Sequence, residues 1–180
     1  MSQRVLCLMV DGFEEIEAVT PIDLLRRAGA EVVTVSLGEV LQVCGRCGVT
    51  MEADALLSEV DAGGFDMLFI PGGPGVTVLR NDGKPAELAA RFAEAGKPVA
   101  AICAAPLVLK DAGLLEGRRF TAHFTTKEEL PEVLLDEKVV VDGSIITARG
   151  AGVALEFGLT LVGRLFGDER AGEVAASIMK

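Results

Sequence analysis

The 180-residue sequence contains no tryptophan and no tyrosine, and only 4% of its residues are aromatic. A core without large rings is built mainly from Ala, Val, Leu and Ile, which favours parallel β-strands covered by helices on both faces. Positive charge is also scarce, since 17 Lys and Arg face 27 Asp and Glu and the net charge is −10. Because a polyanion would be repelled, we expect neither nucleic acid nor a membrane surface as a partner.

Long apolar stretches are absent as well. No apolar run approaches the ~20 residues that a membrane span needs, and positions 1–10 lack the apolar segment of a signal peptide. The four cysteines are too few for a disulfide scaffold, which is typical of a reducing compartment. We therefore expect a cytoplasmic protein with a single domain over residues 1–180.

Strand-like and helix-like patterns alternate along the chain. Pro21 implies either a kink in the first helix or a new start with Thr20 as its cap. The alternation predicts an α/β fold, a doubly wound and mostly parallel sheet with helices on both faces. The predicted elements are strands 5–10, 31–37, 66–70, 97–103 and 119–122, helices 14–27, 85–95, 106–115, 126–135, 154–166 and 168–179, and hairpins 41–52 and 138–148.

The most informative stretch is the predicted strand that ends on Cys103 and passes at once into a helix with Pro106 in its first turn. A nucleophile on such a cramped corner needs small residues two positions before and after it, and Ala101 and Ala105 meet this requirement. The start of a helix also favours a thiolate. Cys103 is therefore a candidate reactive group, and the alternative is a small buried hydrophobe.

Three loops meet beyond the carboxyl ends of the predicted strands: 11–17, 71–75 and 103–104. Loop 71–75 lacks the Lys-Ser/Thr of a phosphate-binding loop and has Val78 where a dinucleotide motif needs its third glycine. It is either a plain tight loop or part of an oxyanion hole. In an oxyanion hole, the N–H of Ala104 and one from Gly72 or Gly73 would face an oxygen beside the sulfur.

Acidic side chains and a single histidine complete the candidate site. Most of Glu14, Glu15 and Glu17 are expected to be solvated charges at a helix start, and periodicity does not show which of them points inward. His123 is the only histidine, so it is the only residue that could supply an imidazole base for Cys103. The alternative is a structural role for His123. A four-ligand zinc site would need His123 and most of the cysteines, so we expect no metal.

The sequence around the remaining three cysteines gives weaker indications of a functional role. Cys44 and Cys47 form a C-x-x-C pair in a glycine-rich hairpin with no helix after it, which favours incidental thiols or a labile disulfide over a thioredoxin-like motif. Cys7 lies within a buried strand and is predicted to be inert. The turn 149–152 is a weak candidate for anion binding.

Taken together, these motifs resemble the ThiJ/PfpI superfamily of class I glutamine amidotransferase-like domains. They are most similar to its Parkinson-disease deglycase branch, which includes the YajL proteins. The resemblance covers nearly the whole chain in order and spacing. The residues that carry it are Val10–Glu17, Pro21–Asp23, Arg26–Gly29, Pro71–Gly73, Ala100–Pro106, His123 and Ala148–Gly152.

The resemblance implies a flavodoxin-like homodimer with Cys103 as an easily oxidised nucleophile. It assigns Glu17 as the buried acid that hydrogen-bonds the sulfur and favours the thiolate or the sulfinate, and it places His123 near the thiol. It also assigns the N–H groups of Gly73 and Ala104 to oxyanion binding. Relatives in the protease-like branch carry a histidine directly after the cysteine, so Ala104 disfavours peptidase chemistry.

Two arginines, Arg46 and Arg27, are candidates for reaching the site from the second copy of a dimer. For Arg46 this follows from the resemblance, although the neighbouring Cys47 departs from the family pattern.

The resemblance predicts a cofactor-independent enzyme of the glyoxalase III or deglycase type, acting on methylglyoxal, glyoxal or early glycation adducts. The small α-oxoaldehyde would be attacked by Cys103 without a metal or other cofactor. A different class of function is a redox sensor or redox-regulated chaperone in the oxidative stress response, working through oxidation of Cys103. Hydrolysis of peptide or amide bonds ranks last.

Overall fold

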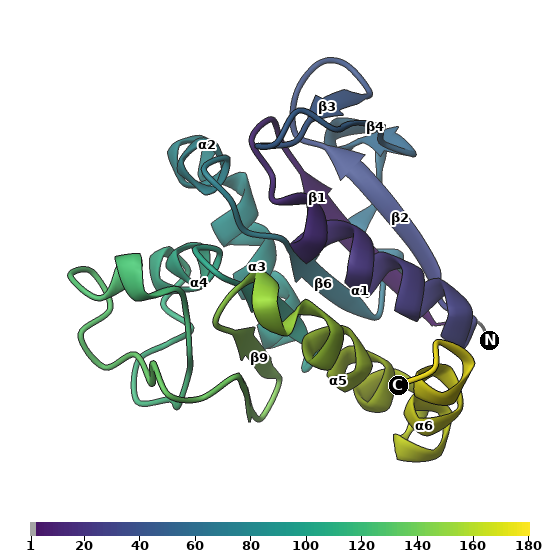
Figure 1. Cartoon of the computed structure of the whole chain (residues 1–180). Helices are drawn as coiled ribbons and strands as arrows, with labels where there is room; N and C mark the ends of the chain where they lie inside the picture. The colour runs from purple at the N-terminus through teal and green to yellow at the C-terminus, as the bar shows by residue number, and fades with distance from the viewer. Residues whose placement is uncertain (1–2) are drawn as a thin grey trace.

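The computed structural model describes residues 3–180, and its central element is a seven-stranded sheet in the order β5-β2-β1-β6-β7-β9-β8 (Figure 1). Neighbouring strands are parallel except β8 and β9, which form an antiparallel hairpin. The predicted α/β class with a mostly parallel sheet is confirmed. The strands are β1 (Arg4–Met9), β2 (Glu31–Ser36), β5 (Ala55–Leu56), β6 (Met67–Ile70), β7 (Val99–Ile102), β8 (Val139–Asp142) and β9 (Ile145–Ala148).

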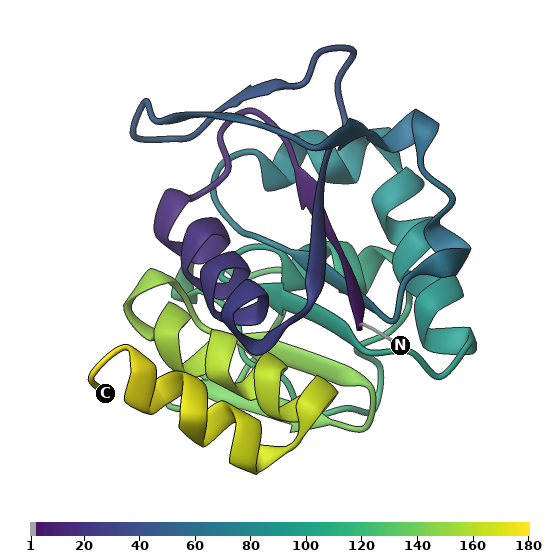
Figure 2. The same cartoon turned by 90° about the vertical axis from the view of Figure 1, so that its right-hand side faces the viewer.

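Helices cover both faces of this sheet (Figure 2). One face carries α1 (Glu15–Ala28), α5 (Ala154–Phe166) and α6 (Asp168–Ser177), and the other carries α2 (Val76–Asp82), α3 (Lys84–Glu94) and α4 (Pro106–Asp111). Among residues 3–180, no helix is both long enough and apolar enough to cross a membrane.

Alternate side chains of β1 enter two different cores. Leu6 and Leu8 pack with the helices α2, α3 and α4, whereas Val5, Cys7 and Met9 pack with α1, α5 and α6. Because both faces of a central parallel strand are covered, its sequence is apolar throughout rather than alternating with polar residues. Aliphatic side chains from the same strands therefore fill the cores on both faces of the sheet, although the chain has few aromatic residues.

A small hairpin projects from the main sheet beyond the carboxyl end of β2. Its strands β3 (Gln42–Cys44) and β4 (Thr50–Glu52) form a separate two-stranded antiparallel sheet, as the sequence predicts. The hairpin is hydrogen-bonded to the loop after β1, since the N–H of Gly12 donates to the carbonyl of Cys44 at 2.7 Å. It therefore lies beside the loop that leads into α1.

The structure differs from the sequence prediction at several places, among them the unpredicted strand β5 and the earlier end of α4 at Asp111. Helix α2 was not predicted, because its first turn contains the β-branched residues Val76, Thr77 and Val78, which have low helix propensity. α1 runs without interruption through Pro21, so the new start at Thr20 does not occur.

Two further differences lie in the segment before β8. The predicted strand 119–122 is wrong, because the N–H of Thr121 donates to the side chain of Thr147 rather than to a strand backbone. The predicted helix 126–135 is also wrong. A short 3-10 turn, Phe124–Thr126, is followed by irregular turns that include Pro131, which supplies no N–H to continue a helix. Three more 3-10 turns are Leu57–Glu59, Ala62–Gly64 and Ala151–Val153.

Candidate active site

The carboxyl ends of β1, β6 and β7 bring the three predicted loops together. β1 is the point at which the strand order reverses, because the chain moves from it to β2 on one side and reaches β6 on the other. Such a switch point leaves a crevice beyond the strand ends. The loops are joined there by two backbone hydrogen bonds of 3.0 Å, from Glu14 N–H to Gly72 and from Gly75 N–H to Gly12.

Cys103 occupies a strained backbone corner between β7 and α4. Its φ of 65° is in the left-handed region, which costs a residue other than glycine about 1–3 kcal/mol. Two hydrogen bonds of 2.8 Å hold this conformation: the Cys103 N–H donates to Ala148 and its carbonyl accepts from the His123 N–H. Ala101 and Ala105 beside it are fully buried. The sharp corner predicted from the sequence is present.

Glu17 points inward from the first turn of α1 and is only 1% exposed. Its carboxylate accepts a hydrogen bond of 3.1 Å from the N–H of Gly72 and is in hydrogen-bonding contact with the Cys103 thiol. Burial, with a smaller contribution from the nearby carboxylate of Glu14, raises the pKa of Glu17 to about 7, although the hydrogen bonds from the Cys103 thiol and the Gly72 N–H act in the opposite direction. Glu17 is thus a carboxyl group poised to exchange a proton near neutral pH.

The Cys103 sulfur is flanked by groups with opposite effects. Burial raises the pKa of the thiol to about 12, and the Glu17 carboxylate acts in the same direction. The N–H groups of Gly73 and Ala104 face the sulfur and lower its pKa, but by less. Desolvation and an ionised Glu17 therefore favour the protonated thiol and outweigh the short helix start of six-residue α4. The thiolate expected from the resemblance stays a prediction.

Two glycines allow the loops to approach the thiol closely. A side chain on Gly72 would overlap the Glu17 carboxylate and the Cβ of Cys103. Gly73 has a φ of 100°, and a side chain there would press on the backbone between Gly12 and Glu14. The Pro-Gly-Gly sequence after β6 thus permits direct contact between the thiol, the carboxyl group and two backbone N–H groups.

His123 lies next to Cys103 through its backbone rather than through its ring. The imidazole is half-buried, and its Nδ1 pairs with the hydroxyl of Thr125 at 2.8 Å. Within residues 3–180, the ring makes no hydrogen bond to the thiol. The structure brings His123 to the edge of the site, and a proton passing between the ring and the sulfur would travel through substrate or water.

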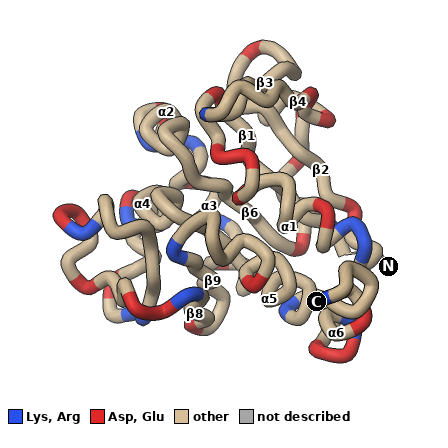
Figure 3. The backbone as a smooth tube through the Cα atoms, viewed as in Figure 1, with Lys and Arg blue, Asp and Glu red and all other residues tan. Residues whose placement is uncertain are grey.

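Acidic positions lie in the loop that leads into α1 (Figure 3). The other acidic residues of this loop are not fully solvated, so the expectation of solvated charges is wrong for most of them. Glu14 is 8% exposed and caps α1 by accepting the N–H of Glu17 at 2.8 Å. Glu15 accepts the N–H of Cys47 at 2.7 Å and so fastens the hairpin to α1. Both carboxylates therefore shape the loop that positions Glu17.

The two arginine candidates lie elsewhere on this chain. Arg27 is in the last turn of α1, about 15 Å along the helix from Glu17, and pairs with Asp23 at 2.7 Å. Arg46 lies in the exposed turn of the hairpin, where its N–H donates to Phe13. Within one chain, neither guanidinium contacts the thiol site among the described contacts.

The sequence matches the model of the DJ-1/PfpI family over residues 3–164. The chain belongs to the DJ-1/PfpI family. It is 39% identical over 93% of its length to protein DJ-1 homolog B of Arabidopsis thaliana, of which it covers 39%. The chain thus spans less than half the length of the plant relatives it matches.

Relatives of similar length carry activity names. The chain is 35% identical over 83% of its length to a protein named deglycase from Thermococcus kodakarensis, covering 91% of it. It is 34% identical over 92% of its length to a glutathione-independent glyoxalase of Caenorhabditis elegans, covering 89%. The crystal structure of Drosophila melanogaster DJ-1beta superposes with a TM-score of 0.94 at 34% identity, covering 99% of this chain and 98% of that one. The flavodoxin-like fold expected for the family is confirmed.

The remaining cysteines of this DJ-1/PfpI chain lie away from the corner. Cys7 is fully buried in β1, and burial raises the pKa of its thiol. Cys44 and Cys47 are exposed in the hairpin, and both thiols are free. Within the part of the chain that the structure describes, no group of three or more His, Cys, Asp and Glu residues is arranged to hold a metal ion.

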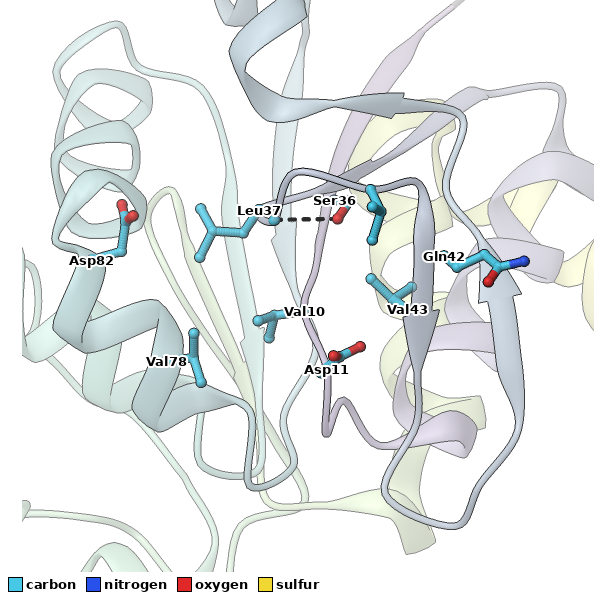
Figure 4. A pocket seen from close by; sticks show the side chains of 10 residues that line it. Val10, Asp11, Ser36, Leu37, Gln42, Val43, Val78 and Asp82 are labelled. Carbon is cyan, nitrogen blue, oxygen red and sulfur yellow. Dashed lines mark hydrogen bonds between the residues drawn. The ribbon is translucent and has the colours of Figure 1, made fainter.

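A separate cavity of about 350 Å³ lies at the carboxyl ends of β1 and β2 (Figure 4). Apolar side chains from the residues just after β1 and β2, from the hairpin and from α2 line it, together with the carboxylates of Asp11 and Asp82. The sequence analysis missed this cavity, because residues that are distant along the chain form its wall. It does not include Cys103, Glu17 or His123.

Proposed function

We propose that this protein is a cysteine-dependent glyoxalase or deglycase that acts on methylglyoxal, glyoxal or early glycation adducts without a cofactor. The observation that carries the proposal is the contact between the Cys103 thiol and the buried Glu17 carboxyl group, with two backbone N–H groups facing the same sulfur. The deglycase and glyoxalase names of similar-length relatives support the same chemistry.

In the first step, the Glu17 carboxylate takes the proton of the Cys103 thiol as the sulfur attacks the aldehyde carbon. The product is a hemithioacetal, and the former carbonyl oxygen carries the developing negative charge. The N–H groups of Gly73 and Ala104 face this position and stabilise the charge. A high resting pKa of the thiol is compatible with this step, because deprotonation and attack occur together.

Glu17 then passes the thiol proton to the former aldehyde oxygen, which completes the hemithioacetal. In the second step, a proton moves from the former aldehyde carbon to the neighbouring carbonyl carbon, and the hydroxyl proton of the hemithioacetal moves to the neighbouring oxygen. Glu17 and His123 carry it, and the result is a thioester of a 2-hydroxy acid. Water then hydrolyses the thioester, which releases lactate from methylglyoxal or glycolate from glyoxal and restores the thiol. One carbon is oxidised and its neighbour is reduced, so the reaction needs water but no external oxidant or reductant.

The thiol and the carboxyl group titrate as a pair. Burial raises the pKa of both groups, so the pair loses its first proton near pH 7 and keeps the second until far higher pH. The reactive form holds one proton. We therefore expect kcat/KM to rise with pH through about 7.

We also propose that the protein is a homodimer. The α1 surface opposite the core exposes Ile16 by 54% and Val19 by 43%, and the adjoining hairpin exposes Val49 by 54%. Packing two copies through these apolar residues would cover them. Ile16→Glu should then halve the mass measured by light scattering, whereas an unchanged mass would argue against this interface.

The decisive experiment is a turnover assay with the purified protein. We expect conversion of methylglyoxal to lactate without added cofactor, loss of this activity in Cys103→Ser and near loss in Glu17→Gln. Cys7→Ala is the matched control, because it removes a buried thiol outside the site. Activity that survives Cys103→Ser but requires Cys44 and Cys47 would point to disulfide chemistry instead.

A second candidate function is redox sensing through Cys103. The same N–H groups that face the sulfur would bind the oxygens of a sulfinate, which favours oxidation at this position. If the protein shows no turnover and peroxide adds two oxygens to Cys103 by intact mass, the sensor function replaces the enzyme function.

A further inference from the structure

One of the eight phenylalanines is exposed, although the chain is poor in aromatic residues. Phe124 is 67% exposed and follows directly after His123. Six of the others, including Phe120 in the same segment, are at most 4% exposed, and Phe166 is partly buried. Exposing a phenylalanine forfeits about 1.5–3 kcal/mol of burial. Its position beside the candidate active site suggests a role in binding.

The Phe124 ring is held rather than free. It packs on the imidazole of His123 with ring centroids 4.3 Å apart and a tilt of 36°. The two residues open a 3-10 turn in which the N–H and the hydroxyl of Thr126 donate to the carbonyl of His123 at 2.9 and 2.8 Å. An aromatic surface is thus presented in a fixed orientation next to the only histidine.

This surface lines a cavity of about 490 Å³ together with residues from the turn before α5, among them Arg149 and Gly150. Gly150 connects the cavity to the thiol site. A Cβ placed on Gly150 would lie 3.5 Å from Cδ2 of His123 and 3.9 Å from Oε1 of Glu17. The cavity therefore shares a wall with the group that exchanges protons with Cys103.

We propose that this cavity is a subsite for the aromatic substituent of a larger α-oxoaldehyde, which we name the Phe124 subsite. The proposal rests on the proposed function, since the aldehyde carbon has to reach Cys103. Phe124 supplies an aromatic surface for the substituent, and Arg149 supplies a cation for a carboxylate at its far end. The substrate class is arylglyoxals, with those that carry a carboxylate on the ring preferred.

The reaction of an arylglyoxal follows the same steps as that of methylglyoxal and likewise needs water but no external oxidant or reductant. For phenylglyoxal, the Cys103 sulfur adds to the aldehyde carbon and the thiol proton passes to the aldehyde oxygen. A proton then moves from the aldehyde carbon to the carbon that bears the ring, and the hydroxyl proton moves to the oxygen on the ring-bearing carbon, which gives a thioester. Water cleaves the thioester and releases mandelate and the free thiol. The ring itself forms no bond.

The test compares two substrates in the same enzyme. The readout is the ratio of kcat/KM for phenylglyoxal to kcat/KM for methylglyoxal, because a general loss of activity cancels in it. We expect Phe124→Ala to lower this ratio about fivefold, mainly through KM for phenylglyoxal, and Phe124→Leu to lower it less. Val141→Ala on β8, where the side chain is 50% exposed, is the control and should leave the ratio unchanged.

A second arm tests the cationic end of the subsite. Arg149→Gln should lower kcat/KM for 4-carboxyphenylglyoxal about fivefold more than that for phenylglyoxal. Arylglyoxals also modify arginine side chains, so the methylglyoxal rate is measured again after each assay to show that the enzyme is unaltered.

The outcomes separate the subsite from the proposed function. Turnover of methylglyoxal with an unchanged ratio in Phe124→Ala overturns the subsite and leaves the function standing. If neither substrate is converted, the function fails, and the subsite is then tested by titrating benzoylformate, an aromatic α-oxo acid, into the wild type and Phe124→Ala. Saturable shifts of the His123 ring signals in the wild type alone would support the subsite, and their absence would overturn it.

Discussion

Cys7 lies in the apolar core at one face of the sheet and the partly buried Cys103 packs against the same core, yet the surroundings of the two thiols differ. Cys7 lies within β1 against the sulfur of Met9 at 3.8 Å. Cys103 lies one residue beyond β7, where Glu17 and the N–H groups of Gly73 and Ala104 face it. Burial raises the pKa of both thiols. The carboxyl group and the N–H groups beside the sulfur, rather than a lowered thiol pKa, therefore distinguish Cys103, the proposed nucleophile, from Cys7.

The largest expected difference between the two thiols is in accessibility. In the native protein, Cys103 should react with iodoacetamide about a thousandfold faster than Cys7, because Cys7 is fully buried and is reached only when the fold opens. Mass spectrometry of the labelled peptides over time measures both rates. Equal rates would remove the distinction between the two environments.

The next effect concerns the close approach at Gly72. Gly72→Ala should lower kcat/KM for methylglyoxal by at least about a hundredfold, because the added Cβ would separate Glu17 from Cys103. Gly172→Ala in α6 is the matched control, since nothing lies within 4 Å of a Cβ added there. Activity that persists in Gly72→Ala, with a folded protein by circular dichroism, would contradict the role of this contact.

The raised pKa of the buried Glu17 carboxyl group predicts that the stability of the protein depends on pH between about 4.5 and 7. No carboxyl group with a raised pKa lies in contact with Cys7 among the described contacts. The folded pKa of Glu17, about 7, is above the ordinary value of 4.5, so its contribution is full below pH 4.5 and is lost as the pH rises through 7. Relative to Glu17→Gln, the wild type should lose about 3 kcal/mol of unfolding free energy over this interval. Urea unfolding of both proteins at several pH values measures it, and parallel curves would contradict the pKa shift.

The smallest expected effect is a change in the pKa of Cys103 when Glu17 is replaced, and it tests the coupling between these two groups most directly. Glu17→Gln should lower the pKa of Cys103 by about one unit or more, because the carboxylate that raises it is removed. The pH dependence of Cys103 alkylation measures this, with Cys44 and Cys47 replaced by serine in the background. A rise in the pKa would instead show that Glu17 favours the thiolate, as the family resemblance implies.

Much of the fold and the position of the site could be predicted from short segments. The corner at Cys103 was predicted because Ala101, Ala105 and Pro106 are local requirements of a strand, a tight turn and a helix start. Helix α2 was missed because packing on the sheet, as with Leu79, outweighs its low intrinsic propensity. The segment around Thr121 was predicted as a strand because its apolar pattern fits one, although side-chain hydrogen bonds hold it instead.

The sequence by itself determined the alternation of strands and helices, the small residues around Cys103 and the glycines that let loops meet above the sheet. Tertiary structure decided which direction burial moves the thiol pKa and where Phe124 lies, and it decided which glutamate reaches the sulfur, a choice that periodicity left open and only the family resemblance anticipated. The physical reason is that propensities and turns depend on neighbouring residues, whereas burial and charge depend on groups such as Glu17 and Gly72, which are 55 positions apart and meet only in the folded chain.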